Sequence, residues 1–144
     1  MKSHDLSYIA GYFDGEGCIF ISTRTTSYKE QIYKSYYLAC KVGSTNLMSL
    51  KFIESIFGGS TAVHKWRLEH YPNRRKFWAW TVYSEQAINF LKAIYPYLIL
   101  KKAEAELAFK FQNSKTSHQT QTEEQKAIWE AERILMQNLK KAQI

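Results

Sequence analysis

The chain has 144 residues, of which 45% are hydrophobic and 15% aromatic, a composition that suits one compact domain with a buried core and excludes disorder for most of the chain. Its 20 lysines and arginines outnumber its 13 acidic residues, and the net charge of +7 favours a polyanionic partner or an anionic surface. The two cysteines, Cys18 and Cys40, support neither a disulfide framework nor a zinc site, and no apolar run approaches the roughly 20 residues of a membrane span.

The organisation predicted from the sequence is a single domain over residues 1–144. No linker rich in proline, glycine or serine divides residues 1–112, so we expect the core of the domain over about 5–112. A polar loop and a C-terminal amphipathic helix then occupy 113–144. The opening residues lack the apolar segment of a secretory signal. We therefore expect the protein to work in the compartment that encodes it, an organelle or a bacterial cytoplasm.

The first half of the chain predicts two helices separated by a hairpin. A short helix runs over about 5–13 and ends at the glycines of 15–17, which allow the backbone conformations of a helix end. Alternating runs at 18–26 and 36–43 predict an antiparallel hairpin with one apolar face. Apolar residues then recur at helical spacing up to Gly58-Gly59, so a second helix follows.

The second half predicts another hairpin and more helices. Strands are expected at about 60–68 and 75–83, with a turn around 71–73 between them. Helices follow from Ser84 to Pro96 and over roughly 100–112. The order α-β-β-α-β-β-α, extended by C-terminal helices, indicates an α+β fold in which helices cover one face of an antiparallel sheet. The other face must meet water or a ligand.

The uncovered sheet face is the first candidate for function because its predicted outward positions are polar or basic. Such residues contact phosphates and base edges, and a two-stranded ribbon fits the major groove of DNA. The alternative, an ordinary solvated sheet face, stays open. The candidate DNA-binding residues are Ser22, Arg24, Thr26, Lys41, Lys65, Arg67, Arg74 and Arg75.

The end of the first helix is the second candidate because two acids, Asp14 and Glu16, stand at its negative pole. That placement is costly unless a cation sits there, and the Glu16 carboxylate with the Gly15 carbonyl would suit Mg²⁺. Ala10 and Gly11, together with Gly15, also leave a helix face without bulk, where the same helix of a second subunit could approach. An ordinary glycine-rich turn with solvated acids is the alternative.

Residues 9–17, IAGYFDGEG, resemble the signature of the LAGLIDADG homing endonucleases. The likeness extends to the order of elements and to the segment 95–102, and so spans about 5–112. The chain carries one copy of the motif, which in this family implies a homodimer. The resemblance implies a saddle of two sheets in the DNA major groove, with the motif helices at the dimer centre.

The resemblance also implies roles for individual residues. Glu16 matches the acidic metal ligand, with Mg²⁺ as the cofactor and Ca²⁺ as a non-catalytic substitute. Lys101 matches a basic residue near the scissile phosphate, although a solvated lysine at a helix start fits the sequence equally well. Asp14 is expected to support the dimer interface, and Ser44 or Asn46 is a candidate to hold a water in the catalytic region.

The function that this sequence favours is a site-specific, Mg²⁺-dependent DNA endonuclease. It would bind a long, nearly palindromic duplex as a homodimer and leave short 3′ overhangs. The alternative on the same scaffold is a protein that does not cleave, either an RNA maturase or a transcriptional regulator. A third reading, a basic protein-interaction domain, predicts no salt-dependent affinity for DNA. We expect no interaction with a membrane.

Overall fold

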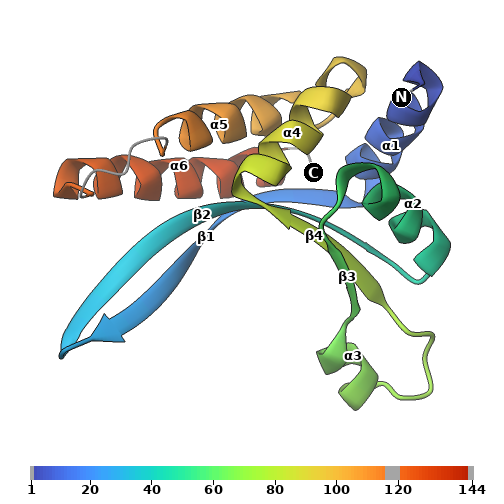
Figure 1. Ribbon diagram of the computed structural model, residues 1–144, viewed down its shortest axis with the longest axis horizontal. Coiled ribbons are helices and arrows are strands. Elements are labelled where there is room, and N and C mark those ends of the chain that lie inside the picture. The colour runs from blue at the N-terminus through green and yellow to red at the C-terminus, as the bar shows by residue number, and fades with distance from the viewer. Residues whose placement is uncertain (1, 116–120, 143–144) are drawn as a thin grey trace.

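A computed structural model describes residues 2–115 and 121–142 of the chain. The four strands form one antiparallel sheet in the order β1-β2-β4-β3, which the helices cover on one face (Figure 1), so the predicted α+β class is confirmed. In chain order the elements are α1 (Ser3–Glu16), β1 (Gly17–Tyr28), β2 (Gln31–Ser44), α2 (Leu47–Phe57), β3 (Ser60–Val63), α3 (Lys65–His70), β4 (Trp78–Tyr83), α4 (Ser84–Ile94), the 3-10 turn η1 (Tyr95–Tyr97), α5 (Lys102–Asn113) and α6 (Glu123–Lys141).

The β1–β2 hairpin follows the predicted alternation. Ile19 pairs with Cys40 and Ile21 with Leu38, and all four side chains are buried toward the helices. The alternate positions of both strands therefore face away from the helical layer. At the tip, Lys29 and Glu30 have φ of 49° and 66°, the left-handed geometry that a two-residue hairpin turn needs to match the strand twist.

Two predicted boundaries are wrong. Helix α1 continues to Glu16 instead of ending near Phe13, because a glycine inside a helix costs only about 1 kcal/mol and the burial of Ile9 and Phe13 offsets that cost. The strand expected at 60–68 ends at Val63. His64 then caps the short helix α3 by accepting the Arg67 backbone N–H at Nδ1, 3.3 Å away. Over so few residues the helical and strand periods are not distinguishable.

The core between the sheet and the helices centres on Phe90. Its ring meets those of Trp80, Phe57 and Phe13 edge-on, with centroids 4.9, 5.0 and 5.1 Å away. Each such pair adds about 0.5–1.5 kcal/mol beyond the area that it buries. None of the helices in residues 2–115 and 121–142 combines the length and hydrophobicity that a membrane crossing requires.

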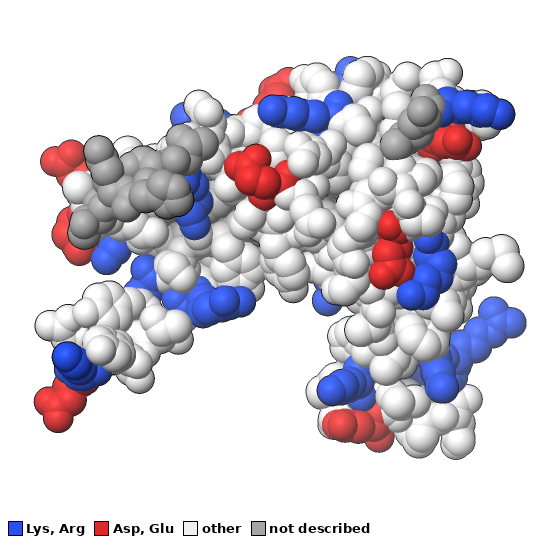
Figure 2. All heavy atoms as spheres, in the orientation of Figure 1, with Lys and Arg blue, Asp and Glu red and all other residues white. Residues whose placement is uncertain are grey.

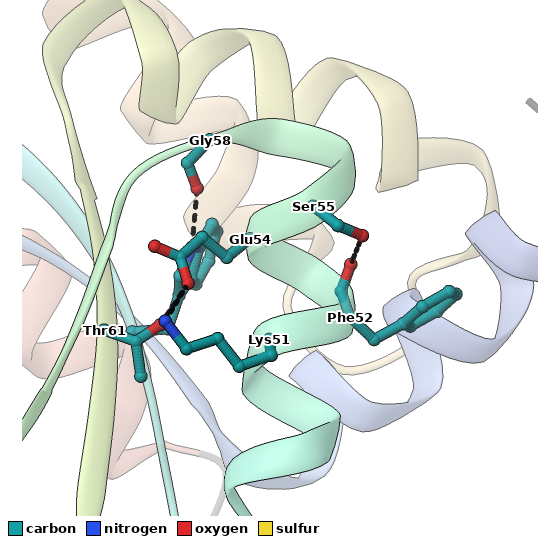
Figure 3. A network of polar contacts seen from close by, with 7 residues as sticks. Lys51, Phe52, Glu54, Ser55, Gly58 and Thr61 are labelled. Atoms are coloured by element: carbon teal, nitrogen blue, oxygen red, sulfur yellow. Dashed lines mark hydrogen bonds and ion pairs between the residues drawn. The ribbon is translucent and has the colours of Figure 1, made fainter.

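Polar contacts fix the end of α2 to the strands of the sheet (Figure 3). The indole N–H of Trp80 donates to the carbonyl oxygen of Gly58 at 2.8 Å. Glu54 accepts a hydrogen bond from Thr61 of β3 and pairs with Lys51 at 2.9 Å. The first contact satisfies a helix-end carbonyl, and both hold α2 against the sheet edge.

Helix α6 packs on the β1–β2 hairpin and on α5, as the predicted amphipathic pattern requires. Trp129 lies 6.2 Å from the rings of both Tyr36 and Phe111, measured between centroids. The Tyr36 hydroxyl donates to Glu130 at 2.8 Å. Hydrogen bonds from Arg133 and then Tyr36 lower the pKa of Glu130 to about 2. The half of the first hairpin that lies nearest the helices is therefore supported by a helix outside the predicted core.

One buried acid of α6 gives a test of this packing. Glu132 is 6% exposed, its Oε2 has no partner among the described residues, and burial raises its pKa above 4.5. Because the fold favours the protonated form, this group's contribution to stability is complete below pH 4.5 and is lost as the pH rises through the folded-state pKa. We expect Glu132→Gln to raise the melting temperature at pH 7 by about 2–4 °C.

This increase in melting temperature should disappear near pH 4, where the wild-type Glu132 carboxyl is mostly protonated in both the folded and the unfolded state. Thermal denaturation followed by circular dichroism at both pH values makes the comparison. Glu124→Gln, on an exposed position of the same helix, controls for the change in net charge. A lower melting temperature for Glu132→Gln at neutral pH would contradict this account.

Candidate nucleic-acid interface and active site

The end of α1 is joined to the start of α5 by Asp14. Its Oδ2 accepts the backbone N–H groups of Ile99 at 2.7 Å and Leu100 at 3.2 Å, and its Oδ1 accepts that of Lys101 at 3.2 Å. The carboxylate thus holds the turn that leads into α5, whose N-cap residue, Lys101, makes no side-chain cap of its own. Asp14 was expected to support the dimer interface, and this stays a prediction; within its own subunit its carboxylate binds these three amides.

Lys101 in turn binds the C-terminal end of α1. Its half-buried Nζ donates to the carbonyl oxygen of Asp14 at 2.7 Å. An ammonium group at a helix C-terminus is favourable because the unpaired carbonyls there carry partial negative charge. The fold therefore brings Lys101 to the same end of α1 as Glu16, although 85 residues separate the two in the chain.

Glu16 is the exposed acid at this helix end. It is the last residue of α1, and within residues 2–115 and 121–142 its side chain forms no hydrogen bond or ion pair. The neighbouring carbonyl oxygen of Gly15 lies beyond the last intrahelical donor. A carboxylate and a carbonyl are hard oxygen ligands, which fit Mg²⁺ or Ca²⁺. The described part of one subunit contains no cluster of three acidic, histidine or cysteine side chains for a metal.

Glu104 lies behind this site, in the first turn of α5. It is 1% exposed, and burial raises its pKa, while the charges of Lys101 and Lys140 act in the opposite direction. Its neutral form is therefore favoured relative to a solvated glutamate. The carboxylate available to a solvent-borne cation at this end of the molecule is that of Glu16.

The predicted water-holding residues act as helix caps. Asn46 accepts the backbone N–H of Met48 at 3.0 Å and so caps α2. Ser44 accepts the backbone N–H of Asn46 through its hydroxyl oxygen, also at 3.0 Å. Both side chains thus stabilise the turn between β2 and α2, and the water-holding role suggested for them stays a prediction.

The residues predicted for a dimer interface fall on different sides of α1. Gly11 and Gly15 are exposed, and a Cβ at either position would meet no atom within 4 Å. Ser7 is also exposed. Ser7, Gly11 and Gly15 are spaced four residues apart, so the three form one smooth helix face. Ala10 is fully buried in the core of its own subunit and cannot present its side chain to another.

The open face of the sheet carries the predicted basic residues of β1 and β2. Ser22, Arg24 and Thr26 alternate with the buried positions of β1. Lys41 of β2 stands beside Thr81 of β4. The Arg24 and Lys41 side chains form no ion pair with a carboxylate among the described residues. Their charge therefore remains available to a ligand.

Two tyrosines on this face complete the surface, and the sequence reasoning did not select them. The Arg24 guanidinium lies 5.5 Å from the ring centroid of Tyr37, and that ring lies 5.9 Å from Tyr83. Tyr37 shares a strand face with Lys41 because the two are four residues apart, which is the signal that could have identified it. The rings hold Arg24 over the middle of the sheet.

Lys65 and Arg67 lie on α3 and not on a sheet strand, which corrects their predicted placement. Arg67 nevertheless reaches the open face, because its guanidinium stacks 4.6 Å above the Phe77 ring. That ring covers Gly43 of β2, where a Cβ would meet it at 2.3 Å. Glycine at position 43 thus lets Phe77 and Arg67 lie against the sheet.

The hairpin and the α3 end project to the same side of the molecule, away from the helical layer (Figure 1). Figure 2 shows a hollow between them, with lysine and arginine side chains on the surfaces that border it. Arg74 and Arg75 are exposed in the segment after α3. The open sheet face is therefore concave, basic and framed on both sides.

The Asp14 contact yields a stability prediction. Asp14→Ala removes the acceptor of three backbone N–H groups, so we expect a loss of about 1–2 kcal/mol in the free energy of unfolding. Asp14→Asn keeps one oxygen acceptor and should lose less. Chemical denaturation and amide hydrogen exchange at 99–101 measure both effects. Unchanged stability with unchanged exchange at these amides would show that the cap is not formed.

The comparisons with known proteins agree with this geometry. A family model described as LAGLIDADG endonuclease matches residues 9–112. The archaeal intron-encoded homing endonuclease I-Vdi141I, solved with DNA, is 14% identical with a TM-score of 0.76, and the match covers 96% of this chain and 86% of that one. A comparison with curated proteins finds no match.

Two further solved structures show the same fold. I-TnaI, a homing endonuclease, is 13% identical with a TM-score of 0.67, and the match covers 94% of this chain and 93% of that one. I-CvuI, solved with its target in the presence of Ca, is 22% identical with a TM-score of 0.59, and the coverage is 78% and 69%. Since the family model spans most of the chain, the protein belongs to the LAGLIDADG endonuclease family.

Proposed function

We propose that the protein is a homing endonuclease that binds double-stranded DNA on its concave sheet and cleaves both strands as a homodimer, leaving short 3′ overhangs. The observation that carries the proposal is the convergence of Glu16 and Lys101 at the end of α1, directly before the strand that opens the basic face. Metal-assisted hydrolysis of a phosphodiester uses two groups beside the same phosphate: an acidic side chain that holds the metal ion, and a positively charged side chain.

The sheet supports the choice of duplex DNA. β1 has 12 residues, so at about 3.3 Å per residue it is roughly 40 Å long, comparable to about 12 base pairs of duplex. Arg24 and Lys41 have no carboxylate partner in the described structure, and a duplex supplies one negative charge per phosphate. Ser22 and Thr26 add hydroxyl groups that can bond to base edges or phosphates.

The smooth face of α1 supports the homodimer. Gly11 and Gly15 allow two helix backbones to approach closely, and a two-fold axis through this face would bring the two Glu16 side chains near each other. A dimer would also double the length of DNA that the sheets contact, which suits a long and nearly palindromic target.

Glu16 and the carbonyl of Gly15 are the groups of this chain that would hold a divalent ion, with Mg²⁺ as the active cofactor and Ca²⁺ as an inactive substitute. Such an ion, when bound, supplies Lewis-acid stabilisation of phosphate charge and lowers the pKa of a bound water. Lys101 would add positive charge where the phosphate becomes more negative. Its bond to the Asp14 carbonyl holds the ammonium group in position.

Glu16→Gln tests the active site. Removing the negative charge should weaken metal binding and lower the cleavage rate by at least about a hundredfold, while DNA affinity stays within about twofold. The substrate is the protein's own genomic insertion site in its uninterrupted form, with cleavage followed on gels in Mg²⁺ and binding in Ca²⁺. Glu124→Gln, an exposed acid on α6, is the matched control. Undiminished cutting by Glu16→Gln would reject the assignment.

Gly11→Leu tests the dimer. A Cβ at this exposed position would meet no atom within 4 Å, so the fold should remain intact, but a leucine would hold a second helix away. We expect a monomer by light scattering and a loss of double-strand cleavage. Asn89→Leu, on the exposed side of α4, is the control. A Gly11→Leu protein that remains dimeric would place the interface elsewhere.

A further inference from the structure

Residues 64–77, which we call the α3 lobe, form a projection without a core. No residue of α3 is buried, and none of the lobe reaches the buried class. Its order depends on stacked rings at the surface: Trp66 lies parallel to His70 with centroids 4.3 Å apart, and meets Tyr71 edge-on at 5.9 Å. Trp66 is 54% exposed and Tyr71 is 43% exposed. So much aromatic surface left in water marks a binding surface.

The charge of the lobe is strongly one-sided. It holds one acid, Glu69, and five basic residues, which are Lys65, Arg67, Arg74, Arg75 and Lys76. Within the described residues none of these five is paired with a carboxylate. The Arg74 guanidinium lies 4.5 Å from the ring centroid of Tyr71, so a cation and an aromatic ring are offered side by side.

A ligand for this surface must be anionic and must also present flat rings. Single-stranded nucleic acid has both properties, because its phosphates are charged and the faces of its unpaired bases are free to stack. A protein surface of acidic residues would satisfy the cations but leave the rings uncovered. A blunt duplex would do the same, since neighbouring base pairs already cover the faces of its bases.

We infer that the α3 lobe is a second nucleic-acid site, which binds a single strand by stacking an unpaired base on Trp66 and by placing Arg74, Arg75 and Lys76 along the phosphates. The site goes beyond the duplex binding proposed for the sheet. The lobe projects beyond the sheet on the side away from the helices (Figure 1), so a strand can reach it without approaching the helical layer.

The test measures the affinity of the full chain for a fluorescein-labelled deoxythymidine or uridine oligonucleotide of about 20 nucleotides, and for a blunt duplex of mixed sequence. Trp66→Ala should weaken single-strand binding by about fivefold to a hundredfold, the range for loss of one base–aromatic stack. Its affinity for the blunt duplex should change by less than about twofold. The oligonucleotide, deoxythymidine or uridine, whose affinity falls more on this substitution identifies the sugar that the site prefers.

A second variant keeps the ring cluster intact in case Trp66→Ala disorders the lobe. Arg75→Gln combined with Lys76→Gln should reduce the slope of log affinity against log salt by about 1.4 for single strands, since each phosphate contact contributes about 0.7. Tyr97→Ala and Lys92→Gln are the matched controls, an exposed ring and an exposed cation in the helical layer. Circular dichroism verifies the fold of each variant.

Single-strand affinity that is unchanged in both lobe variants, or that falls equally in the controls, would overturn the inference. A loss on the blunt duplex as large as that on single strands would also overturn it, because the lobe would then be part of the duplex surface. Arg24→Gln with Lys41→Gln separates the two proposals, since it should weaken duplex binding and leave single-strand binding intact. If that variant binds the duplex as tightly as the wild type, the result contradicts the duplex site proposed on the sheet but not the single-strand site on the α3 lobe.

Discussion

The reciprocal contact between the end of α1 and the start of α5 is the interaction on which the rest of the structure depends. The Asp14 carboxylate accepts hydrogen bonds from three N–H groups of the turn that leads into α5, and the Lys101 ammonium satisfies a carbonyl at the negative end of α1. Each helix end thus supplies the charge that the other lacks. Glu16 lies exposed beside this junction, without a polar partner among the described residues.

A packing constraint then links this junction to the sheet. The Phe13 ring occupies the space that a Cβ at Gly17 would need, with the closest approach at 2.2 Å. Only glycine lets the chain leave the helix at this point and begin β1 beside the buried ring. Glu16 is therefore the residue directly before the strand that faces the basic hollow. The proposed metal ligand and the proposed DNA surface are neighbours because α1 ends and β1 begins at this point.

The sequence pattern predicted those elements whose signal is long and regular. The β1–β2 hairpin alternates over many residues, and α2, α4 and α6 repeat their apolar positions over at least two turns, so the core faces followed from the period. Helix α3 escaped prediction because its six residues fit either period. The face of α1 was also ambiguous, because Ala10 and Gly11 are both small and only the packed core shows which of them points inward.

The arrangement of the site could not be predicted from local sequence patterns, because it depends on contacts between residues that are distant in the chain. Asp14 and its amide partners are far apart in the chain, and these bonds form only because the fold brings the end of α1 to the turn before α5. The position of Arg67 likewise depends on the Phe77 ring, just before β4, and on Gly43 of β2. The resemblance to a family selected Lys101. Glu16 was selected both by its place at a helix end and by the resemblance, and physical reasoning from the residues selected the polar face.

The most direct measurement of the central claim is a crystal structure of the protein on its DNA target in the presence of Mn²⁺, with the ion located by anomalous scattering. The account predicts a two-fold assembly in which the Glu16 carboxylates of both subunits coordinate ions next to the sugar–phosphate backbone. Manganese bound away from Glu16, or one subunit alone on the duplex, would contradict it.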